Sequence, residues 1–189
     1  MKRRRFLQLS LVASTTASVM PRLVGSEDAD RSVQSSRKAI LVKAGKDRDE
    51  RPFQWLDATF QVKVSGKDTE GRCVVFDTLR PEKVGPPLHL HTDCDEWFFV
   101  REGNFKFQVG SDLMRLTPGD SLLVPQNMPH AFVKTSEGVA RLVVMHQPAA
   151  TMEEYFRSVI QQADQTVEGR RALAEKHGMR LVGPALTPD

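Results

Sequence analysis

The chain lacks long apolar runs, and it contains few cysteines and histidines. Its 189 residues include only two cysteines and five histidines. Beyond the N-terminus, no stretch is apolar over the roughly 20 residues that a membrane-spanning helix needs, so no stable span is expected in the mature chain. No internal repeat of barrel size is visible, and this length suits one ordinary domain. These absences favour a single globular domain.

Acidic residues are absent from the N-terminal segment. "MKRRRFLQLSLVASTTASVM" has a positive cluster, a moderately apolar run and then small residues, which is the order found in a signal peptide. Within it, "RRRFLQ" resembles the twin-arginine pattern. We therefore predict a twin-arginine-type signal peptide over residues 1–25 and an exported protein, periplasmic or extracellular. A basic arm or a weak membrane anchor is the alternative.

The positive charge of the chain is concentrated in this segment. Five basic residues precede the first acidic residue, Glu27: Lys2, Arg3, Arg4, Arg5 and Arg22. Their removal would take the formal net charge from +3 to −2. Nucleic-acid binding thereby loses its main support, and we expect no nucleic-acid partner. Residues 26–37 are polar and unpatterned, which predicts a linker.

Residues 38–148 have the hydrophobic pattern of half-buried strands. Apolar residues alternate with polar ones in "FQWLDATFQVKV" and "NFKFQVG", and turn signals such as Pro118-Gly119 recur at roughly ten-residue spacing. The pattern predicts an all-β antiparallel barrel. After Pro148 the apolar period becomes helical, so residues 149–189 are predicted to form a C-terminal helical segment. Cys73 and Cys94 either form one disulfide or remain two thiols.

The stretch "PPLHLHTDCDEWFFVREG" places two histidines at alternate positions of a predicted strand. His89 and His91 therefore point to one face, and the following turn is long enough to return Glu96 on the neighbouring strand. A second stretch, "PGDSLLVPQNMPHAFVKT", offers His130 at the start of another strand. Imidazoles together with a carboxylate suit divalent first-row metals.

Both stretches resemble the two conserved motifs of the cupin superfamily, in its small single-domain, quercetinase-like form. The residues at the motif positions are His89, His91, Glu96, Gly103, Gly119, Pro125 and His130. The resemblance implies a jelly-roll barrel, also called a double-stranded β-helix. It also implies that one metal ion is bound by His89, His91, Glu96 and His130.

Three positions depart from the usual motifs. Lys83 stands where the first motif usually has glycine, although Gly85 is near. Asn127 and Lys134 replace a glycine and an asparagine of the second motif. Asparagine tolerates a left-handed turn better than most residues. None of the three is an expected ligand, so the implied metal site stands.

The resemblance implies a metal-dependent dioxygenase acting on a small oxygenated, flavonol- or catechol-like compound. Iron or manganese is the favoured divalent ion, with nickel, copper or zinc as alternatives. Glu96 is expected to be a ligand or the catalytic base. The alternatives are a decarboxylase or isomerase of a small organic acid, and a non-catalytic periplasmic protein that binds or senses a small ligand. Small cupins often form homodimers, for which residues 38–43 are a candidate edge strand.

The other histidines and the aromatic residues have structural interpretations. His146 follows Leu142 and Val144 on one strand face and is expected in the core or at the rim. His177 precedes Gly178 in a last helical turn, where an imidazolium is favoured. Aromatic residues are predicted to pack the barrel: Trp55, Trp97, Phe98, Phe99, Phe105, Phe107 and Phe132.

Overall fold

The computed structural model describes residues 37–188. The predicted signal peptide, and the linker up to residue 36, lie outside the described residues. Residues 38–43, the candidate edge strand of a homodimer, are irregular and pair with no other strand of the described chain, and the homodimer stays a prediction. Ile40 and Leu41 are 47% and 84% exposed.

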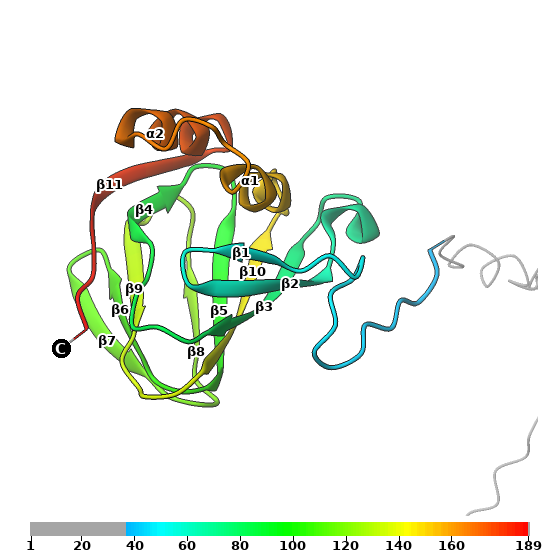
Figure 1. Ribbon diagram of the computed structural model, residues 1–189, viewed down its shortest axis with the longest axis horizontal. Helices are drawn as coiled ribbons and strands as arrows, with labels where there is room; N and C mark the ends of the chain where they lie inside the picture. The colour runs from blue at the N-terminus through cyan, green and yellow to red at the C-terminus, as the bar shows by residue number, and fades with distance from the viewer. Residues whose placement is uncertain (1–36, 189) are drawn as a thin grey trace, which may run out of the picture. The chain divides into compact units, whose positions relative to one another are not determined.

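Two antiparallel sheets make up most of the described chain (Figure 1). The first has the order β1-β2-β3-β10-β5-β8, formed by β1 (Phe53–Trp55), β2 (Ala58–Val64), β3 (Val74–Arg80), β10 (Ala140–Gln147), β5 (Asp95–Glu102) and β8 (Ser121–Val124). The second has the order β11-β4-β9-β6-β7, formed by β11 (Met179–Ala185), β4 (Pro87–His91), β9 (His130–Lys134), β6 (Phe105–Val109) and β7 (Asp112–Leu116). The predicted all-β antiparallel fold is confirmed.

The two sheets face each other across an aromatic core. The Phe98 ring on β5 lies 4.9 Å from that of Phe107 on β6 and 5.5 Å from that of Phe132 on β9. These side chains are buried because alternate residues of each strand point inward. Trp97 and Phe99 lie on the opposite face of β5, where their rings stack at 5.9 Å and are only half-buried.

Two helices cover one end of the sheets (Figure 1). Helix α1 (Met152–Val159) buries Met152, Tyr155, Phe156 and Val159, the one-sided spacing predicted from the sequence. Helix α2 (Val167–Lys176) begins where the Thr166 side chain accepts a hydrogen bond from the Gly169 amide at 3.0 Å. Within residues 37–188 neither helix, nor the short 3-10 helix η1 (Gly66–Thr69), is long and apolar enough to cross a bilayer.

The predicted C-terminal helical segment ends as a strand. Gly178, at φ +71°, terminates α2, because glycine adopts this left-handed conformation without steric cost. The chain then pairs with β4 as β11, so that Met179 lies opposite His91. Residues 179–185, predicted to belong to the helical segment, are therefore a strand, because the edge of β4 is available for pairing. His177 forms the C-cap of α2, and its Nδ1 lies 2.9 Å from the Thr151 hydroxyl.

The departures from the usual motifs have local explanations. Asn127 adopts φ +62°, the left-handed turn expected at this position. The ammonium of Lys134 is buried and donates hydrogen bonds to the carbonyl oxygens of Pro81 and Gly138, so the lysine connects two loops.

The two cysteines do not form a disulfide. Cys73 and Cys94 are free thiols, and burial raises the pKa of Cys94.

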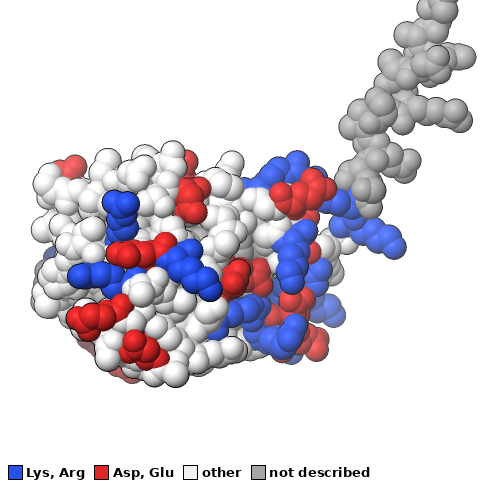
Figure 2. Space-filling model, turned by 90° about the horizontal axis from the view of Figure 1, so that it is seen from above, with Lys and Arg blue, Asp and Glu red and all other residues white. Residues whose placement is uncertain are grey.

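Charged side chains of both signs are interspersed on the face of the molecule shown in Figure 2. Lysines and arginines lie next to aspartates and glutamates there, and no continuous basic area covers this face.

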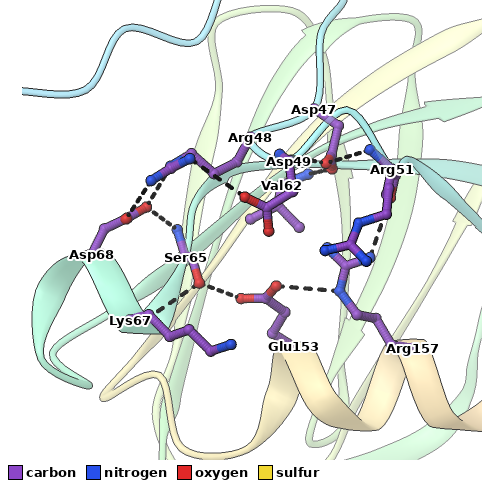
Figure 3. Close-up of polar contacts among 10 residues, drawn as sticks. All are labelled: Asp47, Arg48, Asp49, Arg51, Val62, Ser65, Lys67, Asp68, Glu153 and Arg157. Carbon is purple, nitrogen blue, oxygen red and sulfur yellow. Dashed lines mark hydrogen bonds and ion pairs between the residues drawn. The ribbon is translucent and has the colours of Figure 1, made fainter.

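A polar network fastens the chain before β1 to β2 (Figure 3). The buried Asp47 carboxylate accepts hydrogen bonds from the backbone amides of Val62 at 2.7 Å, Asp49 at 2.9 Å and Arg51 at 3.0 Å. Nearby, the Ser65 hydroxyl donates to Glu153 on α1 at 2.7 Å. Side-chain oxygens thus satisfy backbone amides that have no strand partner.

Replacing Asp47 with asparagine is expected to destabilise the domain. The amide group keeps one acceptor oxygen but turns a donor toward one of the backbone amides, so a buried N–H loses its partner. The expected loss is about 1–3 kcal/mol of unfolding free energy, measured by urea denaturation. Asp49→Asn, at an exposed neighbouring carboxylate, is the control and should unfold as the wild type does.

Candidate metal centre

Four residues predicted as metal ligands meet between the two sheets. His89 and His91 lie on β4, His130 begins β9, and Glu96 lies on β5 of the opposite sheet. Strand pairing places His89 directly opposite His130. One potential ligand atom from each of the four lies within 4.8 Å of all the others. The structure therefore brings together all four residues expected from the sequence.

The four side chains are buried and make short polar contacts. Their exposed fractions are 6% for His89, 3% for His91, 5% for Glu96 and 1% for His130. Glu96 Oε2 lies 2.7 Å from His130 Nε2 and 3.1 Å from His91 Nε2. One carboxylate oxygen is thus shared between two imidazoles.

Backbone carbonyls orient two of the imidazoles. The Nδ1 atom of His89 lies 2.8 Å from the carbonyl oxygen of Pro87, and that of His130 lies 2.9 Å from the carbonyl oxygen of Met128. A carbonyl oxygen only accepts hydrogen bonds, so the proton of each neutral ring resides on Nδ1. The lone pair of Nε2 is then available to the cluster, the arrangement in which histidine binds metals.

A fifth residue, His146, lies beside the cluster. It is fully buried on β10, where strand pairing places it opposite Glu96. Its Nε2 lies 3.3 Å from Glu96 Oε1, without the alignment of a hydrogen bond. The sequence predicted a core or rim position, and the core position is the one observed. The signal for its orientation was the inward period-two face shared with Leu142 and Val144.

Burial and neighbouring charges shift the pKa values of the clustered residues. Burial raises the pKa of Glu96, but the surrounding imidazoles, with His146 the largest contributor, outweigh burial and hold this pKa well below its usual value. Burial lowers the pKa of His89 and of His91. The pKa of His130 is raised, because its bond to Glu96 outweighs burial. An ionised carboxylate thus faces His89 and His91, which readily stay neutral, whereas a metal ion would have to displace the proton that Glu96 favours on His130.

A small inner cavity lies against the cluster. It is lined by His89, His91 and Glu96, by Arg80, and by apolar residues that include Trp55, Pro86, Phe132 and Met179, and its volume is about 20 Å³. Such a volume holds about one water molecule. The cluster therefore adjoins room for a water-sized group but not for a larger molecule.

Arg80 gives this cavity a buried positive charge that the sequence did not indicate. Its guanidinium lies 4.7 Å from the Phe132 ring centroid and 3.9 Å from the carboxylate of Asp57. Its Nη1 has no hydrogen-bond partner. Burial lowers the pKa of Arg80 to about 10, against the opposing effects of Asp57 and Glu96, so the group remains charged at neutral pH.

Solved structures with similar backbones have low sequence identity to this chain. KdgF from Halomonas sp. is 16% identical with a TM-score of 0.47, covering 53% of this chain and 87% of that one. The cupin domain of Schizosaccharomyces pombe Cnp3 is 16% identical with a TM-score of 0.46, covering 57% and 74%. A predicted oxalate decarboxylase from Thermotoga maritima is 13% identical with a TM-score of 0.46, covering 48% and 80%. None of these similarities transfers an activity to this chain.

A family match covers the part of the chain that holds the cluster. No curated protein matches the chain. Residues 75–146, by contrast, match the family model of the cupin domain. The matched residues include all four clustered residues and His146, and they begin on β3 and end on β10. The similarity of this chain to the cupin domain thus lies over residues 75–146.

Proposed function

We propose that this protein is a metal-dependent dioxygenase that acts on a small oxygenated compound, with flavonol- and catechol-like molecules as the leading substrate class. The observation that carries the proposal is the buried convergence of three imidazoles and one carboxylate from opposite sheets. Such a set leaves positions on a six-coordinate ion open for a substrate or a small gas molecule. Iron or manganese is the favoured ion.

The residues fit a divalent ion. Two donor atoms that each lie about 2.1 Å from one ion are about 3 Å apart when they occupy adjacent positions. Glu96 Oε2 lies at 2.7 and 3.1 Å from two imidazole nitrogens, close to this spacing. Three buried imidazole nitrogens at this site have no hydrogen-bond partner among the described residues: His91 Nδ1, His146 Nδ1 and His146 Nε2. Buried polar atoms are usually hydrogen-bonded, so these atoms indicate that the cluster has a role other than packing.

The residues of the chain have distinct roles in this proposal. His89, His91 and His130 hold the ion. When bound, a redox-active ion polarises substrate oxygens and exchanges electrons with dioxygen. Glu96 either completes the ligand set or swings away and accepts a proton from a substrate hydroxyl. Phe98 lies against His130 and Phe156 lies against His146, and these rings exclude water from the cluster.

A decarboxylase or isomerase of a small organic acid is the second candidate, and Arg80 favours it. The guanidinium lines the inner cavity together with three of the clustered residues, and its Nη1 is unpartnered. The carboxylate of a substrate that reached the cluster would lie near the positive charge of Arg80. Release of carbon dioxide without consumption of dioxygen distinguishes this candidate from the dioxygenase.

Metal content and gas exchange test the proposal. Protein isolated from the producing cells would be assayed for bound metals, and then for oxygen uptake with flavonols and catechols and for carbon dioxide release with small acids. We expect iron or manganese near one equivalent and oxygen uptake with a flavonol or catechol. Bound zinc with neither gas response would contradict the proposal and favour a non-catalytic binding protein.

A further inference from the structure

A second, much larger cavity lies next to the candidate metal centre. This outer cavity has a volume of about 840 Å³ and is bordered by β1, β4, β11 and the two helices. Its walls include Trp55 of β1, Tyr155 of α1, Arg170 and Arg171 of α2, and Leu181 of β11. Cavities of roughly 300–1,000 Å³ hold drug-sized molecules. The C-terminal helices and β11 thus build a site large enough for a whole small molecule.

The walls of the outer cavity are mostly apolar, although they are open to solvent. Four large apolar side chains from different segments line it and remain 46–58% exposed: Leu56, Ile160, Val167 and Val182. Scattered exposed apolar side chains need no explanation, but here they surround one hollow. A grouping of this kind marks a surface that binds an apolar ligand.

The charged groups of the outer cavity are all of one sign. Arg170 and Arg171 line it, and its lining includes no aspartate or glutamate. Within residues 37–188 neither guanidinium makes a hydrogen bond or an ion pair. Two unpaired guanidiniums beside apolar walls favour a ligand with an anionic group, because arginine binds carboxylates and similar anions through two parallel hydrogen bonds.

The outer cavity meets the candidate metal centre at His89. This histidine lines both cavities, as do Trp55, Pro86 and Met179. Because the inner cavity has only about 20 Å³, a substrate larger than a water-sized group must be held in the outer cavity. Its reacting end would then lie at the boundary marked by His89.

We propose that the outer cavity binds an amphipathic anion, a largely apolar small molecule with one carboxylate or a similar acidic group. Arg170 and Arg171 hold the acidic group, and the apolar body extends toward His89. Trp55, which the sequence assigned to packing, forms part of this wall. The inference rests on the proposed function, because it takes the substrate of the metal centre to be an oxygenated aromatic compound that also carries an acidic group.

Paired fluorescent probes test the ligand class. The anionic probe 8-anilinonaphthalene-1-sulfonate and the uncharged N-phenyl-1-naphthylamine share their ring system and differ in the sulfonate. We expect the wild-type protein to bind one equivalent of the anionic probe at least tenfold more tightly. In the Arg170→Gln/Arg171→Gln double variant this preference should disappear, since a hydrogen bond to a charged group is worth about tenfold or more in affinity.

Two further variants and a metal-free sample complete the test. Arg180→Gln removes an exposed arginine of β11 that does not line the cavity, and it should bind both probes as the wild type does. Ala185→Trp fills the cavity and should weaken both probes. Wild-type protein stripped of metal with a chelator should bind both probes as the untreated protein does, which separates this inference from the proposed function. Equal affinity of the two probes in the wild type, or an unchanged preference in the double variant, would overturn it.

A cobalt-loaded sample tests the link between the cavity and the metal centre. Saturating 8-anilinonaphthalene-1-sulfonate should shift the visible absorption of bound Co²⁺, because the probe contacts the wall formed by His89. A cobalt spectrum that is identical with and without the probe would overturn the assignment of this cavity to the substrate of the centre. A sample that binds no cobalt would instead contradict the proposed function, and the probe affinities would still decide the ligand class.

Discussion

Replacing Gly85 with alanine is expected to prevent stable folding of the domain. A Cβ atom at Gly85 would lie 1.7 Å from the carbonyl oxygen of Phe132 and 2.8 Å from its carbonyl carbon. Backbone atoms of β9 cannot move aside as a flexible side chain can, so β4 and β9 would have to separate. We expect a loss of more than about 4 kcal/mol, the range reserved for severe packing defects. Urea denaturation, or the soluble yield if the variant aggregates, measures the effect.

The same substitution at Gly183 is the matched control. There an added Cβ would meet side-chain atoms of Leu88 at 3.0 and 3.2 Å, which can shift. Gly183→Ala should therefore cost far less than Gly85→Ala. Because the segment after Gly85 carries His89, and β9 carries His130, the close approach also sets the spacing of the cluster. Equal stability of the two variants would show that the backbone at Gly85 does not lie against that of Phe132 as described.

Replacing Glu96 with alanine is expected to destabilise the metal-free protein strongly. The carboxylate contacts His91, His130 and His146, and its bond to His130 raises the pKa of that imidazole, so the carboxylate and a protonated His130 stabilise each other. Removing one partner of a buried ion pair typically costs about 3–5 kcal/mol, because the other is left without compensation. Thermal and urea unfolding in the presence of a chelator measure the loss.

Glu102→Ala provides the control on the same strand. Glu102 is exposed at the end of β5, where loss of a carboxylate should change the unfolding free energy by no more than about 0.5 kcal/mol. If the two variants unfolded alike, Glu96 would not be the electrostatic centre of the cluster. The comparison holds strand, residue type and substitution constant, so burial and contacts are what differ.

The sequence predicted the strands and the four clustered residues because both follow from the spacing of residues close together in the chain. Alternation fixed the inward face of β2 and β6, and His89 and His91 share a face by the same rule. His130 and Glu96 were located by motif spacing. The Asn127 turn was predicted from the tolerance of asparagine for the left-handed conformation.

Other features depended on pairing between segments far apart in the chain. His146 meets Glu96 only because β10 lies beside β5 in a particular register. Strand β11 forms because β4 has a free edge, which no helical or strand pattern near residue 179 reveals. Arg80 is buried at the end of β3 among aromatic rings, where sequence reasoning expects apolar residues. These features belong to tertiary structure rather than to local pattern.

The stoichiometry of bound metal in wild-type, His130→Ala and His177→Ala protein tests the central claim most directly. His177 is as buried as the clustered histidines, but it bonds to Thr151 and lies outside the cluster. Plasma emission spectrometry should find about one divalent ion per wild-type and His177→Ala chain, and little or none in His130→Ala. Equal metal content in His130→Ala and the wild type would contradict the account.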